Sequence, residues 1–241
     1  MYWLALTWIP RTIINLINSR MARFIWSGCK ERRAISLVKW THLTKSKHLG
    51  GWGLKDLDTF GIALKAKNLW RCLFTSSLWN RVILAKYLQG WAVGDWLRLT
   101  SYNVERTSVV WRALLKSIPL LKSWLAWKPG DGWNIRVGRD SIVGLDKGWR
   151  LSDALLTHLM NRNIFFLAQA AKQNSANSWT VWYTSVELGF TDALGIEWDN
   201  YISLLRNISI CLNSAKDCLF WSKNPKDGSI TAAKAYDVAC N

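Results

Sequence analysis

The carboxylates of the chain are the first residues to test for catalysis, because two or three converging carboxylates can bind the Mg²⁺ ions used by polymerases and nucleases. Asp56 and Asp58 form the single Asp-x-Asp pair, and no two aspartates are adjacent. Because this pair precedes a run of apolar residues, helix capping is the favoured interpretation and a metal site is the alternative. Asp131, between two glycines, is typical of a turn. The sequence therefore predicts no complete active site, no metal, no cofactor and no enzyme activity of the chain alone.

The remaining catalytic and ligand-binding templates find no match. All three histidines lie upstream of the closest cysteine pair, Cys211 and Cys218, and no CxxC spacing for zinc occurs. The five cysteines are therefore predicted to be reduced thiols, which favours an intracellular protein. The glycine loop at residues 50–53 lacks the Lys-Ser/Thr of a P-loop, so a phosphate cradle is the less favoured interpretation. No run of 18 apolar residues occurs, so no membrane span is expected. A small-molecule substrate is not expected either.

Positive charge is the strongest chemical signal in the sequence. Lysine and arginine number 32 against 16 acidic residues, a net charge of +16 that indicates a polyanionic partner. Residues 1–60 and 61–125 carry +7 and +8, whereas residues 181–241 carry −2. This asymmetry predicts phosphate contact by the first half, although a solvated loop remains the alternative for the densest run, at residues 30–33. The residues expected to contact phosphates are Arg20, Arg23, Lys30, Arg32, Arg33, Lys39, Lys45 and Lys47.

Tryptophan is the second signal, with 18 residues. Single strands are commonly held by bases that stack on aromatic rings beside cationic side chains. Trp26, Trp70 and Trp79 continue or adjoin apolar helix faces and are predicted to belong to the core. The tryptophans in loop-like or basic surroundings, for which stacking is weighed against core packing, are Trp40, Trp52, Trp91 and Trp96. Of these, Trp40 and Trp52 are the predicted nucleic-acid contacts.

Helical periodicity dominates the elements that must position these residues. Apolar residues at three- and four-residue spacing, preceded by capping residues, predict helices over about 10–26, 56–74, 77–87 and 108–117. Two β-hairpins are predicted at about 124–137 and 217–231, and a β-like run at 35–40. Further helices are predicted near residues 153–160, 179–188, 198–213 and 232–240. The prediction is a mainly α fold with small β-hairpins (α+β), divided into a basic, mostly helical region 1–125 and a mixed α+β region 126–241.

Several segments, taken in order, resemble one family. They are Phe24-Ile-Trp-Ser-Gly28, Val38-Lys-Trp40, Gly50-Gly-Trp-Gly-Leu-Lys-Asp-Leu57, Leu69-Trp-Arg71, Trp127-Lys-Pro-Gly-Asp-Gly132, Asp217 to Trp221 and Gly228-Ser-Ile-Thr-Ala-Ala-Lys-Ala-Tyr236. This ordered set resembles the C-terminal part of plant LINE-type (non-LTR) retrotransposon reverse transcriptase polyproteins, between the polymerase palm and the zinc-binding region. The resemblance covers nearly the whole chain.

The resemblance implies a thumb-like region over residues 1–125 and a connection region over residues 126–241, truncated before the zinc-binding region. The paired aspartates of the family's catalytic centre have no counterpart here, so the implied protein is a non-catalytic fragment of an RNA-directed DNA polymerase. Its basic half would grip the backbone of RNA or an RNA–DNA template–primer without sequence specificity, beside the palm domain of the parent polymerase, in the nucleus. An inert or protein-interacting remnant of a decayed retroelement is the alternative.

Overall fold

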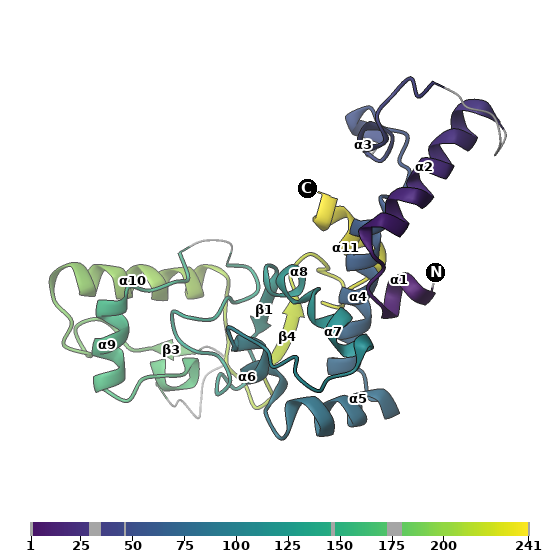
Figure 1. The fold of residues 1–241 in the computed structure, drawn as a ribbon. Helices are drawn as coiled ribbons and strands as arrows, with labels where there is room; N and C mark the ends of the chain where they lie inside the picture. Colours follow the sequence, from purple (N-terminus) through teal and green to yellow (C-terminus); the bar gives the residue numbers. More distant parts are fainter. Residues whose placement is uncertain (1, 29–34, 46, 146–147, 173–179, 241) are drawn as a thin grey trace. The chain divides into compact units, whose positions relative to one another are not determined.

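A computed structural model describes residues 2–28, 35–45, 47–145, 148–172 and 180–240. The chain forms two compact units, and helices predominate (Figure 1). Unit 1 comprises residues 1–123 together with residues 229–241, and unit 2 comprises residues 124–228. The strands of the described residues form antiparallel pairs, so the expected class, mainly α with small β elements, is confirmed.

Unit 1 is built around one long helix, α4 (Leu57–Phe74), which is contacted by α1, α5, α7, α8 and α11 (Figure 1). The other helices of this unit are α1 (Tyr2–Leu6), α2 (Arg11–Ser27), α3 (Trp40–Leu43), α5 (Leu78–Ile83), α6 (Val93–Arg98), α7 (Val109–Leu115), α8 (Ile118–Lys122) and α11 (Ala232–Cys240). A 3₁₀ turn, η1 (Lys47–Leu49), follows α3, and a π-helical turn, η2 (Leu84–Leu88), continues α5.

Capping and a small residue explain how α4 begins and packs. Asp56 is its N-cap, because the carboxylate accepts hydrogen bonds from the Thr59 N–H at 2.9 Å and the Thr59 hydroxyl at 2.7 Å. Gly61 is buried one turn later, and a Cβ atom placed on it would lie 3.4 Å from the side chain of Leu4 in α1. Gly61 therefore lies at the contact between α4 and α1.

Helix α11 covers the beginning of α4. The hydroxyl oxygen of the buried Tyr236 accepts the Asp56 N–H at 2.9 Å, and its ring meets Phe60 edge-on with centroids 6.0 Å apart. The Lys55 ammonium lies 4.0 Å from the centre of the same ring. Burial raises the pKa of Tyr236 to about 12, so the phenol stays protonated at neutral pH. The C-terminal helix is thus fastened directly to the cap of α4.

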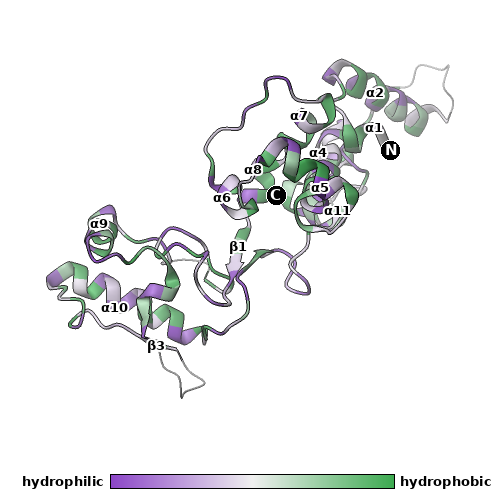
Figure 2. Cartoon of the chain, turned by 90° about the horizontal axis from the view of Figure 1, so that it is seen from below, coloured by the Kyte–Doolittle hydropathy of each residue, from purple (hydrophilic) through white to green (hydrophobic). Residues whose placement is uncertain are grey.

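Unit 2 packs two helices and short strand pairs around a core rich in tryptophan. Its elements are β1 (Leu125–Lys128), α9 (Asp153–Asn161), η3 (Leu167–Ala170), β2 (Ala171–Lys172), β3 (Val181–Trp182), α10 (Asp192–Asn207) and β4 (Cys218–Trp221). Hydrophobic and hydrophilic residues alternate along α10, as in an amphipathic helix (Figure 2). Trp182 and Trp198 are fully buried, and the Trp198 indole N–H donates to the Tyr183 carbonyl at 2.9 Å. The polar atom of the central indole is therefore satisfied inside the core.

The strand pairing corrects the two predicted hairpins. Strand β1 pairs antiparallel with β4, with Leu125 opposite Trp221 and Lys128 opposite Cys218, while β2 pairs with β3. Each predicted hairpin therefore supplies one strand to a pair that joins the two ends of unit 2. Residues 133–137 do not pair with β1; their contact is a bridge from Arg136 to a segment near η3.

Asp217 provides the physical reason for this pairing. One oxygen of its carboxylate accepts the N–H groups of Gly130 at 2.7 Å and Gly132 at 2.9 Å, and the other accepts the N–H of Asn134 at 2.8 Å. Two amides of the Gly-Asp-Gly turn and that of Asn134 are thus bound to a residue just before β4. These bonds hold the start of β4 beside the end of β1.

Several helix predictions match the structure and others do not. Helices α2, α4, α7, α9 and α11 closely match the predicted ranges 10–26, 56–74, 108–117, 153–160 and 232–240. The predicted helix over 179–188 is wrong: its described part forms β3 and then a turn, which the Glu187 carboxylate closes by accepting the N–H and hydroxyl of Thr184. Helix α10 begins six residues before the predicted start. Residues 35–39 have no ladder partner among the described residues and form no strand.

Candidate nucleic-acid interface

Helix α2 carries two of the predicted phosphate-binding residues on one side. Pro10 precedes the helix, and Gly28, with a φ of 68°, ends it by donating its N–H to the Phe24 carbonyl at 2.9 Å. Arg20 and Arg23 are exposed, and their three-residue spacing places them on the same side of the helix. The two guanidinium groups can therefore approach a common ligand.

A different side of α2 faces α3 across a groove of about 510 Å³. The groove is lined by Arg11, Asn15, Asn18, Ser19, Ala22, Trp40, Thr41, Asp56 and Asp58. At 3.6 residues per turn, Arg20 lies roughly 140° around the helix from Asn15, so it points away from this groove. Trp40 is half-buried in the groove, and its indole N–H has no hydrogen-bond partner among the described residues. Trp40 and Arg20 therefore do not contribute to one continuous cluster.

The loop after α3 brings Lys45, Lys47 and Trp52 together. The Trp52 N–H donates to the Leu43 carbonyl at 3.1 Å, and the Gly53 N–H donates to the Lys45 carbonyl at 3.0 Å. Gly53 has a φ of 71°, which allows this tight return. Because these amides are bonded within the loop, they are not available to bind phosphate.

Trp52 is held against the end of α2 while much of its ring stays accessible. Its ring centroid lies 5.7 Å from that of Trp26, with the ring planes tilted by 50°. Trp52 is 53% exposed, whereas Trp26 is half-buried. An ordered and partly exposed indole next to two lysines is suited to stacking on a base.

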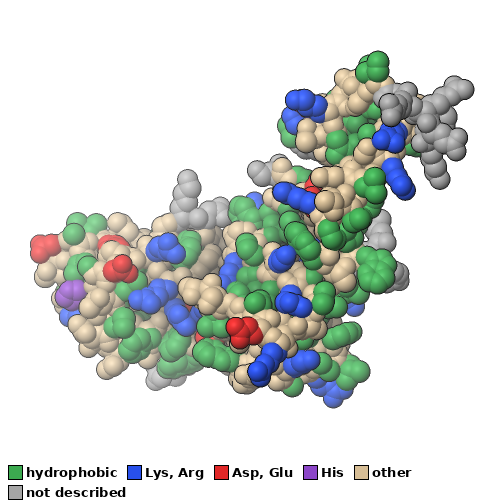
Figure 3. All heavy atoms as spheres, viewed as in Figure 1, with side chains coloured by type: hydrophobic (Ala, Val, Ile, Leu, Met, Phe, Trp, Pro, Cys, Tyr) green, Lys and Arg blue, Asp and Glu red, His purple; other side chains and the backbone are tan. Residues whose placement is uncertain are grey.

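The predicted cations of this region have few acidic neighbours. Arg20, Arg23, Lys39, Lys45 and Lys47 are exposed, and none forms an ion pair with a described residue. Nearby, the Arg11 Nε lies 3.8 Å from the Asp58 carboxylate. Lysine and arginine side chains lie along the segment of α2 and α3, separated by hydrophobic ones (Figure 3). The segment therefore presents positive charge that its own side chains leave largely unneutralised.

The predicted site residues that the structure describes all belong to unit 1 and fall into three places. Arg20 and Arg23 lie on the exposed side of α2, Lys39 and Trp40 at the start of α3, and Lys45, Lys47 and Trp52 in the loop beyond it. The predictions for Lys30, Arg32 and Arg33 lie outside the described residues.

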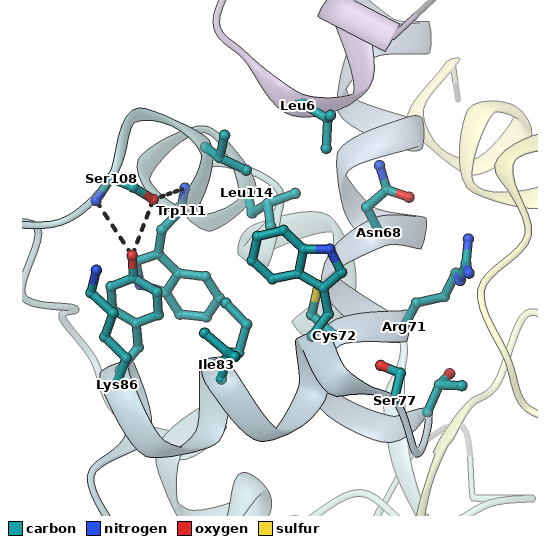
Figure 4. A pocket seen from close by; sticks show the side chains of 15 residues that line it. Leu6, Asn68, Arg71, Cys72, Ser77, Ile83, Lys86, Ser108, Trp111 and Leu114 are labelled. Atoms are coloured by element: carbon teal, nitrogen blue, oxygen red, sulfur yellow. Dashed lines mark hydrogen bonds between the residues drawn. The ribbon is translucent and has the colours of Figure 1, made fainter.

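A second concave site, between α4, α5, η2 and α7, was not expected from the sequence (Figure 4). Trp79, predicted to be core, is 65% exposed at this cavity of about 680 Å³. Trp96, a stacking candidate by sequence, is instead buried, with its ring centroid 5.7 Å from that of Trp111. The available signal was Ser77-Leu78-Trp79, a capped helix start followed by two large apolar residues that prove to be exposed.

The carboxylates have structural roles in this chain. Asp56 caps α4, as predicted, and Asp131 accepts the Trp133 N–H at 3.1 Å within its turn. In the part of the chain that the structure describes, no group of three histidine, cysteine, aspartate or glutamate residues could hold a metal ion. No described helix is both long enough and apolar enough to cross a membrane.

Comparison with known proteins finds two relatives in Arabidopsis thaliana. No protein-family model and no solved structure matches the chain. One relative, described as "Putative ribonuclease H protein At1g65750", is 29% identical over an alignment of 161 residues that covers 60% of this chain and 24% of that protein. The chain thus spans about a quarter of the length of this relative.

The second relative is described as "Uncharacterized mitochondrial protein AtMg00310". It is 31% identical over 137 residues, which are 56% of this chain and 86% of that protein. The chain belongs to the family of this mitochondrial protein. Both the AtMg00310 protein and the longer relative come from a plant, as the ordered sequence motifs implied.

Proposed function

We propose that this chain is a fragment of a retroelement-derived protein whose unit 1 binds the backbone of RNA or an RNA–DNA hybrid without sequence specificity. The observation that carries the proposal is a set of exposed cations without ion pairs to described residues, on α2 and in the segment from α3 to η1. These are Arg20, Arg23, Lys39, Lys45 and Lys47. Among residues 1–55 the sequence has one acidic residue, Glu31.

Exposed lysines and arginines bind phosphates by displacing condensed counterions, so the affinity falls as salt rises and does not depend on base sequence. The half-exposed Trp52 beside Lys45 and Lys47 would add stacking on an unpaired base. The resemblance of the ordered motifs to a reverse transcriptase polyprotein supports this function, as does the relative described as a ribonuclease H protein.

The apolar side of α2 supports a second candidate function, contact with another protein. Ile13, Leu16 and Phe24 are 46%, 50% and 59% exposed on the helix that carries Arg20 and Arg23. A group of exposed apolar side chains bordered by polar ones is typical of interaction surfaces. Under this alternative a protein, such as the palm domain of a parent polymerase, covers α2. At 3.6 residues per turn Arg20 lies within this apolar stripe and Arg23 beside it, so the partner would contact Arg20 as well.

The test measures binding of the whole chain to a labelled RNA–DNA hybrid by fluorescence anisotropy at several salt concentrations. Replacing Arg20 and Arg23 by glutamine is expected to weaken binding and to reduce the slope of log Kobs against log salt by roughly 0.9 for each phosphate that is no longer neutralised. The matched control replaces Arg139 and Arg206, two exposed arginines of unit 2, and removes the same net charge.

A larger effect of the α2 pair than of the control pair, on both affinity and slope, supports the proposed function. Equal effects of the two pairs would show that net charge alone drives binding, and the α2 assignment would fall. No binding by the folded wild-type chain would favour the protein-contact alternative.

A further inference from the structure

The cavity of unit 1 between α4, α5, η2 and α7 has an apolar body. Ile83, Trp111 and Leu114 are buried in its wall, and Leu6 of α1 closes one side (Figure 4). Its volume of about 680 Å³ lies within the range of small-ligand sites. The structure therefore contains a formed pocket, away from the cations of α2 and α3.

The indole of Trp79 lines this pocket and is exposed. Trp79 is 65% exposed and its neighbour Val82 is 44% exposed, although both line a concave apolar surface. The Ser77 hydroxyl accepts the Asn80 N–H at 3.2 Å and starts α5, so the helix that carries Trp79 is anchored at this point. By contrast, the faces of Tyr87 and Trp111 stack on each other, with centroids 4.5 Å apart and planes 3° from parallel. Trp79 is the lining indole whose face is left to a ligand.

The polar lining of the pocket favours an anion. Arg71 and Lys86 are exposed at its edge, no carboxylate lines it, and neither residue has an ion pair with a described residue. Burial raises the pKa of the Cys72 thiol, so this group stays neutral and adds no negative charge. The hydroxyl of Tyr87 donates to the Ser108 hydroxyl at 3.0 Å, which fixes the ring beside Lys86.

We propose that this pocket binds one nucleotide unit, with its base against the indole of Trp79 and its phosphate on Arg71 or Lys86. This inference rests on the proposed function in one respect, since the nucleotide then belongs to a strand bound by unit 1. The exposed aromatic face matches the base, the apolar wall matches the sugar, and the two cations, with no carboxylate beside them, match the phosphate. A free mononucleotide has the same chemistry and is the other possible source of the ligand.

The experiment titrates the full-length chain with adenosine 5′-monophosphate by calorimetry and with a labelled eight-residue oligoadenylate by fluorescence anisotropy. Trp79→Ala is expected to weaken oligoadenylate binding by at least about five-fold, as the loss of one base stack does. Arg71→Gln, at an exposed position with little risk to folding, is expected to weaken it as well. The matched controls are Trp133→Ala, which removes a similarly exposed indole in unit 2, and Arg81→Gln, which removes an exposed arginine of α5 that does not line the pocket.

Sensitivity to Trp79 and Arg71, but not to the two controls, supports the pocket. Binding of the oligonucleotide much more tightly than the mononucleotide identifies a strand as the source, and equal affinities identify a free nucleotide. Equal losses in Trp79→Ala and Trp133→Ala would overturn the inference, as would binding of sodium decanoate or an acidic peptide in place of either nucleotide. The double variant of Arg20 and Arg23 separates the two proposals. If it weakens hybrid binding while Trp79→Ala changes the affinity for neither adenosine 5′-monophosphate nor the oligoadenylate, the proposed function stands and the pocket inference fails.

Discussion

Replacing Asp217 by alanine is expected to destabilise unit 2 by about 3 kcal/mol. The Asp217 carboxylate accepts three backbone N–H groups, those of Gly130, Gly132 and Asn134, at 2.7 to 2.9 Å. A hydrogen bond to a charged group contributes about 1.5 kcal/mol or more, and the two glycine amides are partly buried whereas the Asn134 amide is exposed. Counting the two partly buried bonds at about 1.5 kcal/mol each gives the expected loss.

The control is Asp131→Ala in the same turn. Asp131 accepts one N–H, that of Trp133, at an exposed position, so its removal is expected to cost less than about 1 kcal/mol. Urea unfolding followed by tryptophan fluorescence measures both losses, and hydrogen exchange of the Gly130 and Gly132 amides localises them. If Asp217→Ala changed stability no more than Asp131→Ala, or left exchange at the two glycines unchanged, Asp217 would not be the residue that holds the turn.

Three further outcomes are expected. Asp56→Ala removes the cap whose carboxylate binds Thr59, and is expected to cost about 1 kcal/mol in the free energy of unfolding; unchanged urea unfolding would contradict the capping role. The hydrogen bond from Lys172 lowers the pKa of Glu187 to about 2. The ionised Glu187 therefore stabilises the fold fully above pH 4.5, its ordinary pKa, and this stability is lost as the pH falls toward 2. Glu187→Gln is expected to flatten that part of an acid-unfolding curve, and an identical curve would show that the contact is not formed. Trp198→Phe leaves a cavity and one unsatisfied backbone carbonyl in the core of unit 2, and is expected to lower its free energy of unfolding by about 2 to 3 kcal/mol; a loss below about 0.5 kcal/mol would contradict the buried hydrogen bond.

The elements that could be predicted from the sequence are those whose signals are local. Asp56, Ser77 and Ser108 each precede a helix and accept the N–H three residues on, an interaction that depends on four consecutive residues. The strands could not be predicted in this way. The partner of β1 is chosen by Asp217, a residue far along the chain, and the local turn at residues 129–132 gives no sign of that contact.

The same distinction applies to the candidate sites. The charge of α2 and α3 is visible in the sequence because it depends on composition alone. The exposure of a tryptophan cannot be seen in the sequence, because it depends on which helices pack around that residue. Trp96 and Trp79 show this: the first lies in a basic segment but packs on Trp111, and the second follows a helix cap but faces an open cavity.

The attachment of α11 to α4 has a consequence for the order in which the protein can fold. Unit 2, residues 124–228, is an insertion within unit 1, and it is complete before residues 232–240 have been synthesised. Until α11 is added, the side of α4 that receives Tyr236 and the Asp56 N–H that it binds stay exposed to solvent. Synthesis therefore supplies the last strand of unit 2 before the last helix of unit 1, and the N-terminal unit is completed by a segment that is made after the whole of unit 2. During that interval the uncovered side of α4 is an exposed surface to which a chaperone can bind.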